Sequence, residues 1–303
     1  MGEDHSYTKY SFRTCVKITI LQKLAPFSHL PGTCCLIPNS SWVVQAFPTL
    51  LKFENCITGE KREEVLPWKG PIKDFTVQQD LERGCVRIFG HTAQGYRLHT
   101  IQEGKPPSRL EKLSLGMHKA LDWEMVKRRC NMAEILPVWF RLGQLVPPSG
   151  QAWLPPDLKG VFQTYFHGLF TPRLVDEDHL GIFPPDRKIA EDRLALLREG
   201  YLAIRAQFFQ KREGVYIFLP AVAAEFHSGR FLSEAVDFEW SKKSLQKIVL
   251  RSTAACEIVM QLPKPLKSFR MRASLKEKGE RFFCDRPLVL QANATLFCDR
   301  FEK

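Results

Sequence analysis

Alternation of apolar and polar positions predicts strands in the first third of the chain. Between residues 36 and 101, short apolar runs are separated by turn residues, which is typical of a β-rich region. Two of these runs, residues 86–89 and 96–101, stand on either side of a loop bracketed by Gly90 and Gly95. Because glycine adopts positive φ without steric cost, we expect the two runs to form a β-hairpin.

A helical period runs over residues 189–211. Five apolar side chains recur along it at spacings of three or four residues: Leu194, Leu197, Tyr201, Ile204 and Phe208. This spacing places all five on one stripe of a helix. Lys211 and Arg212 suit a helix C-terminus, and Gly214 suits the stop. We expect the stripe to pack against the protein's own core; a seam for a partner helix is the alternative.

The period returns to two after Gly214. Seven strands are expected there, over residues 215–219, 236–240, 246–251, 257–262, 268–271, 288–291 and 294–297. Their spacing is typical of a β-sandwich, so we predict a C-terminal antiparallel sandwich-like module.

The segment before the long helix supports two interpretations. Ser108 with Glu111 fits a capping box and predicts the start of a helix, whereas the alternation over residues 113–116 is typical of a strand. Asn131 with Glu134 forms a second capping pair.

These patterns predict an α+β fold with an N-terminal β-rich region, a central helical segment and a C-terminal antiparallel β-sandwich-like module. The expected divisions are an N-terminal segment without an assigned fold (residues 1–35), a β-rich region (36–104), a helical region (105–212) and the sandwich-like module (213–303). The alternation over residues 16–20 suits a strand in the first of these segments.

Composition narrows the class of protein. The chain of 303 residues carries a net charge of +11, and residues 241–281 hold eleven basic but only three acidic side chains. Such a region favours a polyanion or an acidic partner. The polar, acidic start does not resemble a signal peptide, and no apolar stretch reaches the roughly 20 residues of a membrane span. We therefore expect a soluble, cytoplasmic protein without membrane contact.

Nine cysteines occur without a C-x-x-C pair, so we expect reduced thiols that act as small hydrophobic residues. The sequence contains neither a P-loop nor a G-x-G-x-x-G or G-x-S-x-G motif. No cofactor and no metal site are expected.

Residues 190–262 resemble part of a known family. The features that carry the likeness are the helix that runs into the strand at 215–219, then Leu219-Pro220-Ala221, Ser228-Gly229, Phe238-Glu239-Trp240, Ser252 and Cys256. This order resembles the C-terminal part of bacterial glycoside hydrolases with a six-hairpin helical barrel, as in the α-L-fucosidase family. The resemblance implies a barrel helix that leads into a β-sandwich, and a carbohydrate-active ancestry.

The chain departs from that family in several places. Phe226 stands where the family pattern has tryptophan, and Ser241 to Lys243 stand where it has glycine. Residues 105–212 are too few for a six-hairpin barrel, and the catalytic motifs of the barrel have no counterpart. No catalytic residue is carried over, and the resemblance implies a reduced or inactive relative.

Two groups of acidic residues are candidates for sugar chemistry, because glycoside hydrolysis uses a pair of carboxyl groups. Asp176, Glu177 and Asp178 form the densest group, in an expected loop. Asp122 and Glu124 flank Trp123, whose aromatic face suits a sugar ring. A solvated acidic loop and a helix surface with a core tryptophan are the structural alternatives.

Trp153, His167 and His179 are further binding candidates, because the histidines flank the acidic loop and Trp153 lies in a proline-framed loop. The histidines lack the close spacing of a metal motif. The leading hypothesis is a carbohydrate-associated protein that binds an oligosaccharide and, if it is an enzyme, is a glycoside hydrolase. The alternative is a non-enzymatic basic protein that binds nucleic acid or an acidic partner. In that case bases could stack on Phe269, Phe282 and Phe283.

Overall fold

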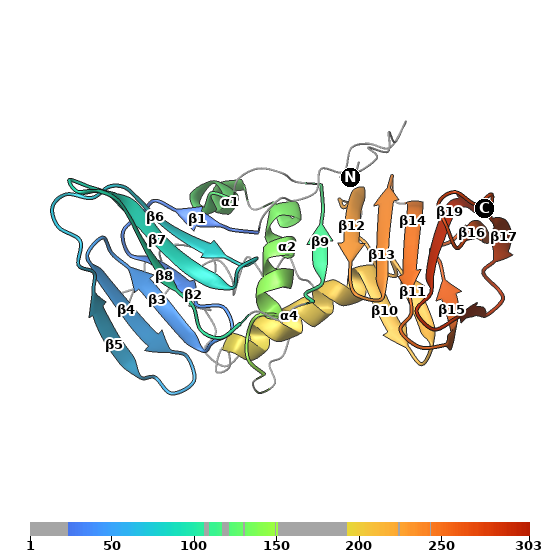
Figure 1. The fold of residues 1–303 in the computed structure, drawn as a ribbon, viewed down its shortest axis with the longest axis horizontal. Coiled ribbons are helices and arrows are strands. Elements are labelled where there is room, and N and C mark those ends of the chain that lie inside the picture. The colour runs from blue at the N-terminus through green and yellow to red at the C-terminus, as the bar shows by residue number, and fades with distance from the viewer. Residues whose placement is uncertain are drawn as a thin grey trace, which may run out of the picture.

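The computed structural model describes residues 24–105, 109–116, 121–129, 131–148, 150, 193–223, 225–242 and 244–303. Two modules of β-sheet stand at the two ends of the molecule, and helices fill the space between them (Figure 1). The α+β class is therefore confirmed, with strands in the majority. No helix in these ranges is long and apolar enough to cross a membrane.

The N-terminal module consists of two four-stranded antiparallel sheets. One has the order β2 (Thr33–Leu36), β3 (Trp42–Ala46), β4 (Leu50–Asn55), β5 (Lys61–Val65). The other has the order β1 (Phe27–Ser28), β6 (Lys73–Asp80), β7 (Cys85–Thr92), β8 (Gly95–Ile101). Their inner faces form one apolar cluster, in which Val44, Leu51 and Ile88 are fully buried.

The predicted hairpin is confirmed, with a shorter loop than expected. Thr92 pairs with Gly95, so only two residues connect β7 to β8. Gly90 lies inside β7 rather than in the loop. A Cβ atom at Gly90 would lie 2.7 Å from Cγ2 of Ile72 and 3.0 Å from the carbonyl oxygen of Lys73. The glycine is thus required by the close approach of the chain at the start of β6.

Three described helices occupy the centre: α1 (Trp123–Arg129), α2 (Met132–Gly143) and α4 (Arg193–Phe208). Asn131 caps α2, because its side chain accepts a hydrogen bond from the N–H of Ala133 at 2.9 Å. Helices α2 and α4 cross closely: a Cβ atom at Gly200 would lie 2.0 Å from the ring of the fully buried Trp139.

The apolar stripe of α4 packs onto the protein's own core, as predicted. Leu194, Leu197, Ile204 and Phe208 are each at most 1% exposed. The end of the helix was predicted wrongly, because α4 stops at Phe208 and β10 (Phe209–Arg212) follows at once. Lys211 and Arg212 therefore lie on a strand.

The contacts of β10 with neighbouring strands explain why the chain forms a strand at residues 209–212. β10 pairs with β11 (Val215–Phe218) around a turn in which Glu213 and Gly214 both have positive φ. The ring of Phe209 lies 5.5 Å from that of Phe218 and 5.7 Å from that of Phe231. Strand pairing and aromatic packing thus outweigh continuation of the helix.

Ser108, the first residue of the predicted capping box, lies outside the described residues, and its partner Glu111 precedes a strand rather than starting a helix. β9 (Lys112–Ser114) pairs antiparallel with β12 (Ser228–Leu232), so the strand interpretation holds. The region predicted as helical therefore contributes an edge strand to the C-terminal module.

The C-terminal module also consists of two sheets. The smaller has the order β10, β11, β15 (Cys256–Gln261), β18 (Leu288–Leu290). The larger has the order β17 (Glu280–Phe283), β16 (Ser268–Arg272), β19 (Thr295–Glu302), β14 (Ser244–Arg251), β13 (Val236–Ser241), β12, β9.

Most of this module is antiparallel as predicted, but β11 pairs parallel with β15. The pattern of the sequence did not predict β10, β12 or β17. The core of this module contains Phe231, Phe238 and Trp240. It is continuous with the core of the helices, so the apolar packing does not stop at the expected boundary between residues 212 and 213. Among the described residues, the inner faces of the sheets are thus filled by side chains, which leaves the outer faces and the edges for ligands.

Candidate functional site

Six residues singled out by the sequence lie outside the described part of the chain. They are Trp153, His167, Asp176, Glu177, Asp178 and His179. Their expected role in binding or catalysis stays a prediction.

The carboxylates around Trp123 are described, and that of Asp122 has a structural role. Trp123 is only 5% exposed and belongs to the main core, so its ring face is not open to a sugar. Asp122 Oδ1 accepts hydrogen bonds from the N–H groups of Glu124 and Met125 at 3.0 and 3.4 Å. This is the arrangement of a helix cap. The buried ring and the cap favour the structural alternative, a core tryptophan at a helix surface, and a role of Glu124 in sugar chemistry stays a prediction.

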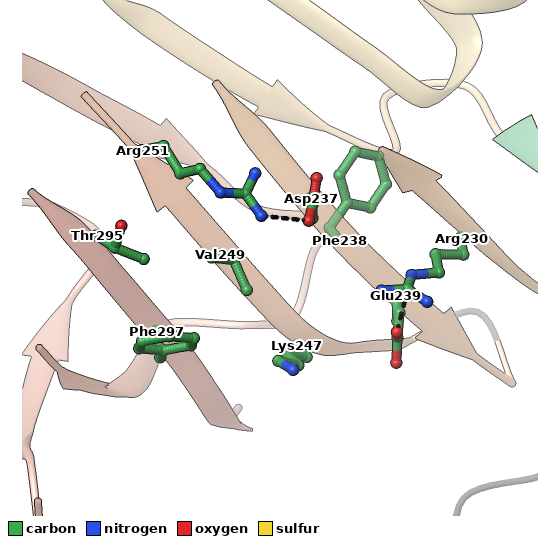
Figure 2. Close-up of a pocket in the computed structure, with 9 residues that line it drawn as sticks. All are labelled: Arg230, Asp237, Phe238, Glu239, Lys247, Val249, Arg251, Thr295 and Phe297. Carbon is green, nitrogen blue, oxygen red and sulfur yellow. Dashed lines mark hydrogen bonds and ion pairs between the residues drawn. The ribbon is translucent and has the colours of Figure 1, made fainter. Parts of the chain in front are cut away.

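A hollow of about 340 Å³ opens on the outer face of the seven-stranded sheet. It is lined by residues of β12, β13, β14 and β19: Arg230, Asp237, Phe238, Glu239, Lys247, Val249, Arg251, Thr295 and Phe297. Figure 2 shows polar side chains of β12, β13, β14 and β19 together with the ring of Phe297. Strand alternation explains why residues two apart, such as Asp237 and Glu239, face the same side.

Two ion pairs line the hollow (Figure 2). Arg251 Nη2 lies 2.5 Å from Asp237 Oδ2, and Arg230 Nε lies 3.1 Å from Glu239 Oε1. The hydrogen bond that Arg251 donates to Asp237 raises the pKa of Arg251 above its ordinary value, against the opposing effect of burial. These pairs fix both the acceptor oxygens and the guanidinium donors in place.

A row of charges crosses the same face, one residue per strand. The register places these residues opposite one another in the order Arg230, Glu239, Lys247, Asp299, Arg270, Arg281. Asp299 also accepts hydrogen bonds from Arg270 at 2.7 Å and from Arg272 at 2.6 Å. Burial alone would raise the pKa of Asp299, but these guanidinium groups outweigh it and lower the pKa. The signs alternate from Arg230 to Arg270, and opposite charges on adjacent strands stabilise a sheet by about 0.2–1 kcal/mol per pair, which is the structural role of this part of the row.

An apolar strip lies beside the charges. Val249 and Phe297 are cross-strand partners, and the ring of Phe297 is half-buried at the edge of the hollow. The hollow thus combines an aromatic surface with donors and acceptors held in fixed positions. Such a combination orients a small polar ligand.

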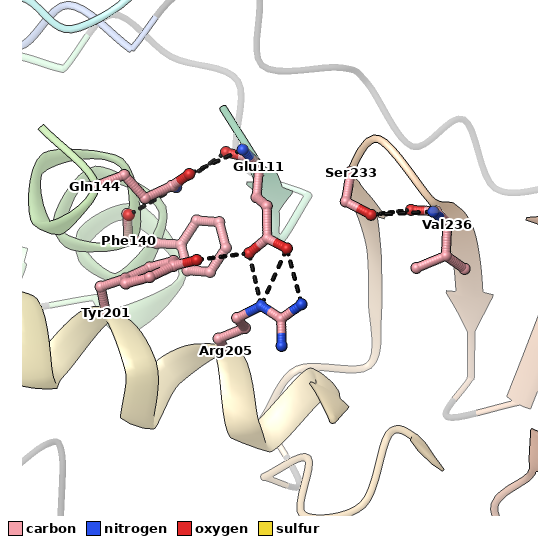
Figure 3. A network of polar contacts seen from close by, with 7 residues as sticks. All are labelled: Glu111, Phe140, Gln144, Tyr201, Arg205, Ser233 and Val236. Atoms are coloured by element: carbon pink, nitrogen blue, oxygen red, sulfur yellow. Dashed lines mark hydrogen bonds and ion pairs between the residues drawn. The ribbon is translucent and has the colours of Figure 1, made fainter. Parts of the chain in front are cut away.

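A second polar network links β9 to the helices (Figure 3). The Glu111 carboxylate accepts hydrogen bonds from Arg205 Nε at 2.7 Å, from Arg205 Nη2 at 2.9 Å and from the Tyr201 hydroxyl at 2.9 Å. Burial and the nearby Glu111 carboxylate raise the pKa of Tyr201 well above its ordinary value. The backbone of Glu111 also exchanges two hydrogen bonds with the Gln144 side chain. Since its members are mutually paired, this network is a structural clamp.

Other reactive groups among the described residues point to structure as well. Burial raises the pKa of Cys35 and of Cys298 to about 12, so both thiols are inert at neutral pH. Within the described ranges, no group of three or more histidine, cysteine or acidic residues could hold a metal ion.

Comparisons with known proteins assign no relative. No protein-family model matches this chain, and no curated protein matches it either. Its function therefore has to be inferred from the residues and their geometry.

The residues of the hollow were not singled out as a site by the sequence. Lys247 and Arg251 were counted only as part of the basic region, and Thr295 and Phe297 belonged to a predicted strand. The signal that could have found them is the alternation of charged residues along the predicted strand over 236–240. Which strands lie beside it depends on long-range pairing, which alternation does not give.

Proposed function

We propose that this protein binds carbohydrate, and that the hollow on the seven-stranded sheet is the sugar-binding site. The observation that carries the proposal is the meeting of the Phe297 ring with two arginine–carboxylate pairs in one open hollow of about 340 Å³. Sugar rings have apolar faces that pack on aromatic rings, and hydroxyl groups that both donate and accept hydrogen bonds. The likeness of residues 190–262 to glycoside hydrolases supports the same class of ligand.

The proposed activity of the hollow is binding rather than hydrolysis. Hydrolysis of a glycoside requires one carboxyl group that gives up a proton. In the hollow, both Asp237 and Glu239 are engaged in ion pairs with arginines, an arrangement that holds them as hydrogen-bond acceptors for a ligand.

Nucleic-acid binding is favoured less by this geometry. Four arginines of the basic region face carboxylates: Arg251 pairs with Asp237, Arg270 and Arg272 pair with Asp299, and Arg281 pairs with Glu302. Their charge is therefore partly neutralised within the protein. Phe269 is 1% exposed, so no base can stack on its ring.

The test is isothermal titration of the full chain with a panel of neutral and acidic monosaccharides and trisaccharides. We expect binding that changes little between about 50 and about 200 mM salt, whereas phosphate contacts would weaken steeply over this range. Phe297→Ala and Lys247→Met should each weaken binding at least fivefold, because each removes a surface of the hollow. Arg281→Ala is the matched control, since Arg281 lies on the same face but outside the hollow. Binding that survives both hollow variants, or that appears only with RNA at low salt, would contradict the proposal.

A further inference from the structure

Aromatic rings collect on the outer face of the sheet β1-β6-β7-β8, in the N-terminal module. The aromatic face consists of five rings and one leucine: Phe27, His29, Phe89, His91, Tyr96 and Leu98. Tyr96 is 50% exposed and Leu98 is 44% exposed. The outer side of an antiparallel sheet is usually polar where water meets it, so exposed rings here call for a ligand.

The strand register brings these rings together. His91 pairs with Tyr96 across the β7–β8 hairpin, and their ring centroids are 5.5 Å apart. The ring of Phe89 lies 6.0 Å from that of Tyr96. On the far strand, Phe27 and His29 have ring centroids 5.2 Å apart. Four strands at about 4.8 Å spacing make the face about 14 Å wide, which suits an extended chain rather than a single small molecule.

Hydrogen-bonding side chains lie between the rings. Arg87 donates to Gln78 Oε1 at 3.3 Å and stands over the ring of Phe89 at 5.9 Å. His29 Nδ1 and Thr76 Oγ1 are 2.9 Å apart. A ligand that stacks on the rings would therefore also meet amide, hydroxyl and guanidinium groups.

The charge of this face selects the class of ligand. Arg87 and Lys73 are the cations on the outward positions of the described strands, and Asp74 lies 3.5 Å from His91. A nucleic acid would need several cations to replace its counterions. The near-neutral balance instead complements an uncharged chain. We propose that the aromatic face binds an extended neutral polysaccharide, whose sugar rings stack on Tyr96, Phe89 and Phe27. This site shares no residue with the hollow of the C-terminal module, and the proposal does not depend on it.

The experiment is affinity electrophoresis of the full chain in native gels that contain soluble xylan, hydroxyethylcellulose, mixed-linkage β-glucan or soluble starch. We expect at least one of these polymers to retard the protein. Tyr96→Ala should weaken that retardation about tenfold, as expected for an exposed aromatic anchor. Its melting temperature should stay within about 2 °C of wild type, because surface substitutions change stability little. Phe89→Leu is the second variant: it keeps an apolar side chain and should weaken retardation without unfolding the hairpin. Arg97→Ala is the matched control, since Arg97 precedes Leu98 on β8 but points to the opposite side.

Each other outcome overturns the proposal. If none of the four polymers retards the protein, or if Tyr96→Ala leaves retardation unchanged, the face does not bind such chains. If Tyr96→Ala abolishes binding to poly(U) that falls steeply with salt, the ligand is a single-stranded nucleic acid. If it abolishes concentration-dependent dimerisation in sedimentation, the face meets a second copy of the chain. Lys247→Met, which alters only the hollow, separates the two sites. If retardation is lost in Lys247→Met and unchanged in Tyr96→Ala, the polymer binds at the hollow and not at the aromatic face.

Discussion

Replacement of Glu111 by alanine should destabilise the protein strongly, because its carboxylate ties the segment that leads into β9 to two side chains of α4. Its oxygens accept hydrogen bonds from Arg205 and Tyr201 of α4, and its backbone meets Gln144 just after α2. Hydrogen bonds to a charged group are worth about 1.5–3 kcal/mol, and loss of one partner of a buried ion pair costs about 3–5 kcal/mol. The side chains are 25% exposed at Arg205 and 17% exposed at Glu111. Because water can reach the guanidinium that is left behind, we expect a loss near the lower limit, about 3 kcal/mol.

The measurement is urea unfolding followed by circular dichroism at the helical wavelength, which reports on α2 and α4. Arg205→Met and the double variant complete a cycle, and the double variant should lose less stability than the sum of the single variants by about 1–2 kcal/mol. Glu63→Ala is the matched control, because the Glu63–Lys52 pair is about half exposed on both sides and should contribute less than about 1 kcal/mol. A Glu111→Ala variant as stable as this control, or a cycle without coupling, would refute the clamp.

Two further predictions concern packing and pH. Gly200→Ala should lower the free energy of unfolding, measured in urea, by about 2 kcal/mol, because overpacking against Trp139 outweighs the gain of about 1 kcal/mol from helix propensity. The control is Leu202→Ala, at a half-exposed position of the same helix. A Gly200→Ala variant that is more stable than wild type would contradict the close contact. Asp299→Asn should be less stable than wild type at pH 7, and this difference in stability should shrink as pH falls below about 4. The reason is that the pKa of Asp299 is lower in the folded than in the unfolded state. Its carboxylate therefore stabilises the fold above the unfolded-state pKa, and this contribution is lost when the carboxylate is protonated. Thermal melts from pH 7 to pH 2.5 check this, and a difference that does not depend on pH would show that the charge of Asp299 is not responsible.

The local pattern of apolar and polar residues predicted two kinds of element correctly: strands that pair with a neighbour close in sequence, and helices that bury one face. The stripe from Leu194 to Phe208 follows from helical spacing alone, and the β7–β8 hairpin follows from alternation around Gly95. The pattern failed where tertiary contacts decide. Phe209 directly follows the apolar stripe and was expected to lie in the helix, yet it begins β10 and its ring packs in the core against Phe218. Glu111 looks like a capping residue until Arg205, ninety-four residues later, supplies its partner.

The two proposed binding surfaces differ in how far the sequence could have shown them. Phe89, Tyr96 and Leu98 lie on the two arms of the predicted hairpin, so part of the aromatic face could have been found from the alternation along these arms, whereas His91 fell in the predicted loop. The hollow was not, because its lining residues come from four strands and only the register brings them together.

The rigid centre of the molecule gives these two surfaces a joint consequence. Both lie on outer sheet faces, in modules that are separated by α2 and α4 (Figure 1). The contact of Gly200 with Trp139 holds the two helices together, and the Glu111 clamp ties β9, an edge strand of the C-terminal module, to both of them. A polysaccharide that is bound at one surface and is long enough to reach the other would meet the second site at a high effective concentration, because the spacing is fixed by packed helices. Short oligosaccharides would gain nothing from this arrangement, so a preference for polymers over trisaccharides of the same sugar is the behaviour that two such surfaces on one rigid frame imply.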